Sequence, residues 1–228
     1  MARSSSSTLP ARKWGPGTAA IARALIAAKA PLTQVALARA VGVSQPRASQ
    51  VLKHLTDAHA VSASPRGYRG RTARLLDLYR DRARPHLVVP ETFWYSTRTL
   101  IEQAHRITDI ARGAEVALAF SADVGPDLLV PWRHPTLAIV YADRDLPLDS
   151  AGLVPAESRV DASIIWRRTT DTTLLTVPAP WPRTIEGVPL TDPVQQWWDL
   201  HDLGGEDRRE AADRLRRAII DKSIAIGT

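Results

Sequence analysis

Three short segments near the start of the chain carry apolar residues at the three- and four-residue spacing of a helix. The segments predict helices over residues 18–30, 33–41 and 44–59. A hydroxyl residue suited to capping opens each helix, namely Thr18, Thr33 and Ser44. Pro31 ends the first helix and Gly42 closes the second. In the second and third helices the residues expected to point inward are Val35, Leu37, Ala38, Val41, Ala48, Val51, Leu52 and Leu55.

Residues 60–79, AVSASPRGYRGRTARLLDLY, place two strand-like runs around a Pro-Arg-Gly-Tyr-Arg-Gly tip, which predicts a β-hairpin. Three short helices with a glycine turn between the second and third, followed by an arginine-rich hairpin, are typical of a winged helix-turn-helix. Over residues 17–80 the chain resembles the DNA-binding domains of many bacterial repressors, including regulators of the multiple-antibiotic-resistance type.

The hydropathy pattern changes beyond residue 84. The segment FWYSTRTLIEQAHRITDIARG predicts a long helix with Leu100, Ala104, Ile107 and Ala111 on one stripe. Short apolar runs between turn residues predict strands at EVALAF, TLAIVY, DASIIW, TLLTV and TIEGV. Two helices follow, TDPVQQWWDLHDLGG and EDRREAADRLRRAIIDK. The predicted fold class is α+β, with a disordered basic arm (1–16), a winged helix-turn-helix (17–84) and a mixed α/β C-terminal domain (85–228).

Charge is divided unequally between these parts. Residues 1–90 hold 15 Lys and Arg against three Asp, whereas the rest of the chain holds 15 basic against 21 acidic residues. A concentrated positive region is expected of a module that binds a polyanion, because each cation that neutralises a phosphate releases counterions. The chain has no cysteine, no apolar run of membrane-spanning length and no apolar leader at its N-terminus, so we expect a cytoplasmic protein without membrane contact.

If the third helix enters the major groove of double-stranded DNA, its polar face divides into two sets. Arginine and glutamine have the donor and acceptor geometry to read base edges, which assigns Gln45, Arg47 and Gln50 to bases. Contacts to the DNA backbone are assigned to Ser44, Ser49, Lys53 and His54. At the wing tip, Arg66, Arg69 and Arg71 would enter the minor groove or straddle its phosphates, with Tyr68 bracing the hairpin. Arg12 and Lys13 in the arm add further backbone contacts.

Two downstream segments carry a second resemblance. LAFSADVGPDLLVPWRHPTLAIVYAD and VPLTDPVQQWWDLHDLGGEDRREAADRLRRAI resemble the C-terminal region of AbiEi-type antitoxins, and the resemblance covers most of residues 17–225. It implies a transcriptional autorepressor that binds repeats in its own promoter through the winged domain. It also implies a partner toxin of nucleotidyltransferase type, counteracted without a required physical contact, in a toxin-antitoxin system. A second copy of the chain, forming a homodimer, is a further candidate partner.

Two other functions remain open. An effector-sensing regulator would bind a small molecule in its C-terminal domain, for example in a pocket lined by Trp94, Trp132, Trp166, Trp181, Trp197 and Trp198. Trp197 and Trp198 lie side by side on a polar helix, so only one is expected to point inward. A nucleotidyltransferase would use Ser121 and Asp123 with Asp143, Asp145 and Asp161, but the spacing is long and the glycine of its motif is missing. The histidines lack metal-ligand spacing, so the sequence predicts no enzyme, metal or cofactor.

Overall fold

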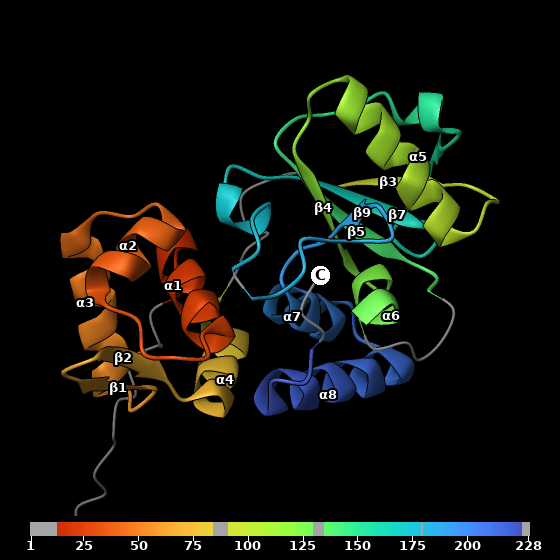
Figure 1. Ribbon diagram of the computed structural model, residues 1–228. Helices are drawn as coiled ribbons and strands as arrows, with labels where there is room; N and C mark the ends of the chain where they lie inside the picture. The colour runs from red at the N-terminus through yellow and green to blue at the C-terminus, as the bar shows by residue number, and fades with distance from the viewer. Residues whose placement is uncertain (1–12, 84–90, 130–134, 179, 225–228) are drawn as a thin grey trace, which may run out of the picture.

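The computed structural model describes residues 13–83, 91–129, 135–178 and 180–224. Its N-terminal part holds four helices and a hairpin, in the order α1 (Pro16–Ala27), α2 (Gln34–Val41), α3 (Gln45–Asp57), β1 (Val61–Ser64), β2 (Gly67–Gly70) and α4 (Thr72–Arg82). None of the helices in the described ranges combines the length and apolarity that a membrane span requires. Figure 1 shows α1, α2 and α3 gathered at one end of the molecule, with the hairpin beside them.

The three predicted N-terminal helices form, but the bounds of the first are wrong: α1 begins at Pro16 with Gly15 as its N-cap, not Thr18, and ends at Ala27, before Pro31. Thr33 and Ser44 cap α2 and α3 through their side chains, and Gly42 ends α2 in the left-handed conformation (φ 69°) that glycine adopts without strain. The residues of α3 predicted to be inward are all buried, Ala48, Val51, Leu52 and Leu55. Val35 is the exception in α2, because it is 55% exposed on the outer face while Leu37 and Ala38 fill the core.

The hairpin is shorter than predicted. Its strands pair from Val61 with Gly70 to Ser64 with Gly67, and the run TARLLDLY forms helix α4 instead of a second long strand. That run is helical because Leu75, Leu76, Leu78 and Tyr79 recur at helical spacing and are buried. A third backbone segment joins the hairpin, since Tyr68 and Leu32 exchange both backbone hydrogen bonds (2.8 and 2.9 Å). Gly67 (φ 120°) lies so close to Leu32 that a Cβ there would be 2.5 Å from its carbonyl oxygen.

The predicted arm is wrong at its C-terminal end. Trp14 is buried, donates its backbone N–H to the Arg82 carbonyl (2.9 Å) and bridges to Ala83 in parallel. Pro16 already begins α1, since its fixed φ suits the first helical turn. The order of this segment follows from burial of a large indole, which outweighs the serine- and glycine-rich composition around it. Residues 1–12 lie outside the described part of the chain.

A five-stranded mixed sheet dominates the C-terminal part, in the strand order β4-β5-β7-β3-β6. Its elements, with a small hairpin and the helices around it, are β3 (Glu91–Tyr95), α5 (Leu100–Gly113), β4 (Leu118–Ala122), α6 (Val124–Leu129), β5 (Ala138–Ala142), η1 (Leu148–Ala151), β6 (Val154–Pro155), β7 (Ile164–Arg168), η2 (Thr172–Leu174), β8 (Thr184–Ile185), β9 (Val188–Pro189), α7 (Pro193–Leu203) and α8 (Glu206–Asp221). β5 and β7 are parallel and the other neighbours in the sheet are antiparallel. The prediction of an α+β fold is thus confirmed.

Two predictions for this part are wrong. Glu91–Tyr95 forms strand β3 and not the start of a long helix, because the helix begins only at the capping box of Thr99 and Glu102. TLLTV contributes to a short 3₁₀ turn, η2, whose Leu174 is buried. The predicted stripe of α5 is correct: Leu100, Ala104, Ile107 and Ala111 are all buried.

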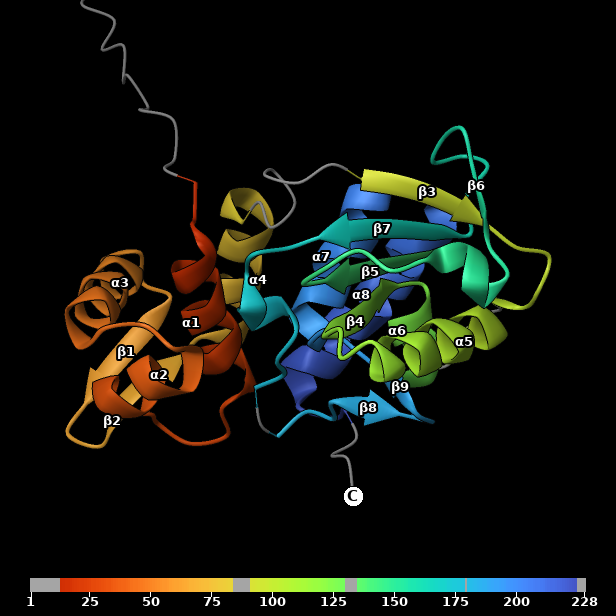
Figure 2. The ribbon, with the colours of Figure 1, turned by 90° about the horizontal axis from the view of Figure 1, so that it is seen from above.

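Helices cover both faces of the sheet. α5 packs with Val140 and Trp166 on one face, whereas Ile139 and Tyr141 point to the opposite face, toward α7. Figures 1 and 2 show α5 on one side of the sheet and α7 with α8 on the other. A single apolar cluster joins the N-terminal helices to α7 and α8, because Leu25 and Tyr79 share it with Trp197 and Leu215. Figure 2 shows α4 between α1 and the pair α7–α8.

Candidate nucleic-acid interface

Helix α3 turns a polar face to solvent. The Ser44 hydroxyl oxygen accepts the Arg47 backbone N–H (3.4 Å), which fixes the start of the helix, and the apolar stripe of α3 faces the core. With that stripe buried, all six other polar residues predicted to contact DNA from α3 and its cap are exposed, in addition to Arg47: Ser44, Gln45, Ser49, Gln50, Lys53 and His54. In the structure these side chains therefore lie on one accessible surface.

The N-terminal half of α3 is tied to its neighbours. The Arg47 guanidinium donates to the Thr18 hydroxyl oxygen on α1 (3.2 Å), and the Gln34 side-chain amide on α2 donates to the Gln45 carbonyl (3.2 Å). Arg47 must leave Thr18 to reach a base edge, which needs only rotation of an exposed side chain. The backbone of α3 is meanwhile held in place by two helices.

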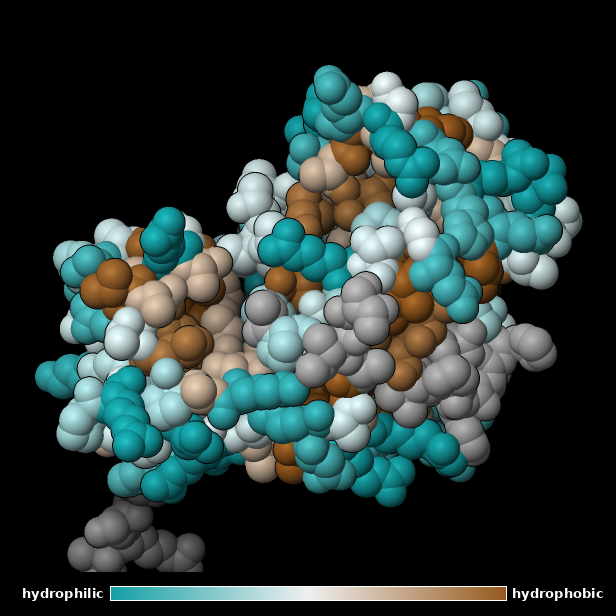
Figure 3. Space-filling view, viewed as in Figure 1, coloured by the Kyte–Doolittle hydropathy of each residue, from teal (hydrophilic) through white to brown (hydrophobic). Residues whose placement is uncertain are grey.

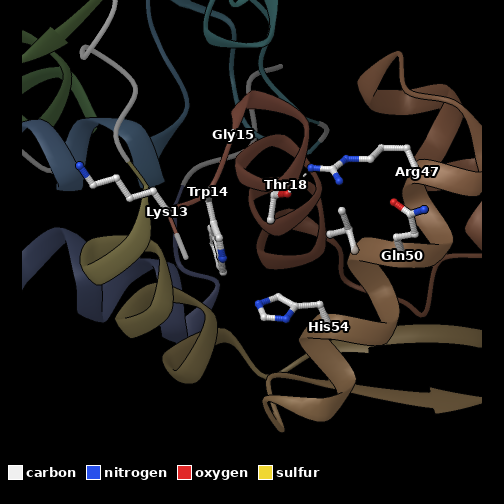
Figure 4. Close-up of a pocket in the computed structure, with 8 residues that line it drawn as sticks. Lys13, Trp14, Gly15, Thr18, Arg47, Gln50 and His54 are labelled. Atoms are coloured by element: carbon white, nitrogen blue, oxygen red, sulfur yellow. Dashed lines mark hydrogen bonds between the residues drawn. The ribbon is translucent and has the colours of Figure 1, made fainter. Parts of the chain in front are cut away.

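A groove of about 470 Å³ lies between α1 and α3. Lys13, Trp14 and Thr18 line it from the N-terminal segment, and Gln50 and His54 line it from α3 (Figure 4). This groove brings together residues predicted for the arm and for α3. Arg12, also predicted for the arm, lies outside the described residues.

The wing prediction needs one correction. Of the three arginines assigned to the tip, only Arg66 lies in the turn, where its N–H bonds the Ser64 hydroxyl oxygen (3.3 Å). Arg69 lies within β2, and Arg71 is the N-cap of α4. The difference arises because the turn consists only of Pro65 and Arg66. Gly67 and Gly70, which were assigned to the tip, instead begin and end β2. Tyr68 is half-buried against the core, in agreement with a bracing role.

Positive charge on α3 and on the hairpin is not neutralised by nearby carboxylates in the described part of the chain. Between residues 13 and 83, Arg47, Lys53, Arg66 and Arg69 are exposed and form no ion pair with a described carboxylate. Two of the three acidic residues in this range are already engaged, Asp77 with Arg216 (3.0 Å) and Asp81 with Arg80 (3.3 Å). Figure 3 shows hydrophilic side chains around the hairpin and apolar ones over α1 and α2.

A buried ionic cluster at the junction of the N-terminal helices and α7 was not predicted. Arg23 of α1 lies 2.7 Å from the Asp192 carboxylate, and both side chains are 1% exposed. Its guanidinium also donates to the Tyr79 hydroxyl (2.9 Å) and to the Thr173 hydroxyl (2.6 Å). Burial raises the pKa of Asp192, and Arg23 opposes that rise. The sequence signal was present, because Arg23 is the one charged residue within the apolar run AAIARALIAA.

The same network continues into the sheet. Tyr79 donates to the Gln195 side-chain oxygen (2.8 Å), and the Gln195 amide donates to the Tyr141 hydroxyl (3.1 Å). Tyr141 donates to Asp199 (2.8 Å), which pairs with Arg167 (3.1 Å). Burial raises the pKa of Asp199, and Arg167 counteracts this shift. The helices that carry the candidate interface are therefore connected to β5 and β7 by a continuous polar path along α7.

Four of the residues considered for nucleotidyltransfer form contacts within the protein. Ser121 is buried and donates to Asp199 (2.5 Å), while Asp123 forms an ion pair with Arg208 (2.8 Å). Asp143 accepts the Ala117 N–H (3.2 Å) and Asp161 accepts the Ser158 hydroxyl (2.6 Å). Across the described ranges, no group of three or more acidic or histidine side chains is arranged to hold a metal ion.

The tryptophan prediction is also corrected. Trp197 and Trp198 are both buried, at 0% and 4% exposure, because α7 is enclosed by α8, the sheet and the N-terminal helices. Trp132 lies outside the described residues.

No protein-family model, curated protein or solved structure was found to match the chain.

Proposed function

We propose that this protein is a sequence-specific regulator of transcription that binds double-stranded DNA through a winged helix-turn-helix over residues 17–84. The observation that carries the proposal is the exposed polar face of α3, whose cations have no described carboxylate partners. A solvated surface without a ligand would gain from interspersed acids, and the net charge of residues 1–90 is strongly positive instead.

In the proposed complex, α3 lies in the major groove with its N-terminal half against the base edges. Gln45, Arg47 and Gln50 read bases, and each bidentate contact discriminates by about 1–3 kcal/mol. The backbone contacts come from Ser44, Ser49, Lys53 and His54. Arg66 at the turn and Arg69 on β2 are proposed to neutralise phosphates, which strengthens binding without selecting sequence.

The regulator is proposed to be an autorepressor of antitoxin type. This part rests on the resemblance of the C-terminal segments to AbiEi-type antitoxins. The buried path from Arg23 to Arg167 supports a C-terminal part that holds the DNA-binding helices rigidly, and it uses Ser121 for structure rather than for phosphate transfer. A gene for a nucleotidyltransferase toxin beside this one would support the antitoxin role.

The test is a footprint and a gel-shift titration on the DNA upstream of the protein's own gene, at two salt concentrations. Arg47→Ala should relax base preference, whereas Arg69→Ala should weaken binding to every sequence and reduce the salt slope by about 0.9. Arg112→Ala is the matched control, because Arg112 is an exposed arginine on α5, paired with Asp109 and remote from α3. Wild-type behaviour of both the Arg47 and the Arg69 variants would refute the assignment.

A further inference from the structure

Hydrogen-bond donors line the groove between α1 and α3, and none of the lining residues carries a carboxylate. Lys13 and Trp14 line one side, Thr18 lies at the α1 end, and Gln50 and His54 line the α3 side (Figure 4). Each of these side chains can donate a hydrogen bond, and none of the groove residues is acidic. The groove is therefore suited to a ligand rich in acceptor oxygens and negative in charge.

The start of α1 adds to this preference. Gly15 is its N-cap and forms no side-chain cap, Pro16 has no N–H, and the first turn contains no acidic residue. A 12-residue helix has a partial positive charge at this end, which an anion stabilises. A Cβ placed on Gly15 would meet nothing within 4 Å, so the approach to the helix end is open.

The Trp14 indole N–H is an independent observation that points to a ligand. Trp14 is only 7% exposed, and its Nε1 has no hydrogen-bond partner in the described structure. The ring is fixed by an edge contact with Tyr79 (6.2 Å between centroids, 80°). Figure 4 shows the indole nitrogen on the side of the ring that faces His54 across the groove. Buried donors are ordinarily satisfied, so this N–H can take an acceptor supplied by a ligand.

The hydrogen-bond partners of His54 and Thr18 leave both with a hydrogen to donate. The Arg82 guanidinium lies 3.1 Å from the His54 Nε2 and can only donate, so Nε2 accepts and Nδ1 carries the ring hydrogen. The Thr18 oxygen accepts from Arg47, which leaves its O–H hydrogen available.

We propose that this groove binds one phosphate of the DNA backbone. In this phosphate site, Trp14, Thr18 and His54 donate hydrogen bonds to the phosphate, and Lys13 lies at the rim. This inference rests on the proposed DNA binding, since the groove is continuous with the exposed face of α3 through Gln50 and Arg47. A phosphate held at the end of α1 fixes the depth and register of α3 in the major groove. The indole N–H is covered in the free protein, so the side chains around it must move to admit the phosphate oxygen.

The phosphate site is tested by recording the NMR signals of the indole N–H groups in the full-length ¹⁵N-labelled protein. Trp14→Phe identifies the Trp14 signal by its loss. A short duplex of unrelated sequence should shift this signal together with the amide signals of α3. If the α3 signals move and the Trp14 signal does not, the phosphate site is refuted while the proposed DNA binding stands. If neither moves, both proposals fail. Inorganic phosphate, added separately, shows by a shift of the Trp14 signal whether an isolated phosphate suffices.

Affinity provides a second test. Trp14→Phe should weaken binding to specific and unrelated duplexes by the same factor, roughly tenfold, as expected for one lost charge-assisted hydrogen bond. The salt slope should be unchanged, because the indole is neutral, whereas Lys13→Ala should lower it by about 0.9. Trp197→Phe is the matched control: its Nε1 is also buried and without a partner in the described structure, but it lies on α7. Equal losses of DNA affinity in the two tryptophan variants would refute the phosphate site.

Discussion

Replacement of Arg23 by methionine tests how the N-terminal helices are held to the rest of the protein. Methionine keeps an unbranched side chain of similar length but removes the positive charge, so the Asp192 carboxylate is left buried without its cation. Both side chains are 1% exposed and lie 2.7 Å apart, so water cannot replace the lost partner. Breaking a buried pair in this way costs about 3–5 kcal/mol in the free energy of unfolding.

The assay is urea unfolding followed by far-UV circular dichroism and tryptophan fluorescence. With a denaturant slope of about 2 kcal/mol per molar, the Arg23→Met midpoint should fall by roughly 2 M. Arg112→Met should change the free energy of unfolding by less than about 1 kcal/mol, because the Arg112–Asp109 pair is about 70% exposed on both sides. Asp192→Asn, combined with Arg23→Met, should recover much of the loss, since asparagine removes the charge and retains an N-cap acceptor for α7.

The pH dependence gives an independent check. Burial raises the pKa of Asp192 in the folded protein, and Arg23 opposes that rise. Without Arg23 the pKa rises further, so the folded variant binds a proton at pH values where the unfolded chain does not. Its deficit relative to wild type should therefore shrink as the pH falls from 8 toward 5. A cost equal to that of Arg112→Met, or a deficit that grows on acidification, would refute the argument from desolvation.

Three further predictions concern single positions. Gly42→Ala should cost about 1–2 kcal/mol, because its φ of 69° strains a side chain, and Gly42→Asn should cost less; thermal unfolding compares the two. Leu37→Ala should cost about 2–5 kcal/mol, whereas Val35→Ala should stay within about 0.5 kcal/mol because Val35 is exposed; equal effects in urea titrations would contradict this burial assignment. Tyr79→Phe should cost about 1–3 kcal/mol, since the Arg23 donor and the Gln195 acceptor both lose their partner; an unchanged midpoint would argue against the polar path.

Local signals predicted the N-terminal helices well. The caps of α2 and α3, the glycine turn and the stripe of α3 all act within a few residues, so short-range pattern suffices to place them. Val35 failed because a short helix with alanines around it has no clear apolar edge, and the packing of α1 decides which side faces inward. The strand-like run after the hairpin failed for a related reason, since its four apolar residues satisfy helical spacing as well.

The contacts that join distant segments were beyond prediction from the sequence. Arg23 and Asp192 are 169 positions apart, and neither residue type alone indicates the other as its partner. The groove was predicted in part: His54 and Lys13 were assigned to the DNA backbone, but Trp14 was assigned to an unfolded arm. Its placement depends on the indole fitting between Tyr79 and the end of α4, which is a property of the assembled fold.

The apolar cluster shared by Leu25, Tyr79, Trp197 and Leu215 limits how this protein can be rearranged. A truncation after α4 would bare the surfaces on which α7 and α8 rest and would leave Arg23 without its carboxylate. Transplanting the first 83 residues onto a foreign partner should therefore yield an aggregating fragment, unless α7 and α8 are carried with them. Under the proposed function, a change of DNA specificity is better sought by exchanging the outward side chains of α3 in the intact chain.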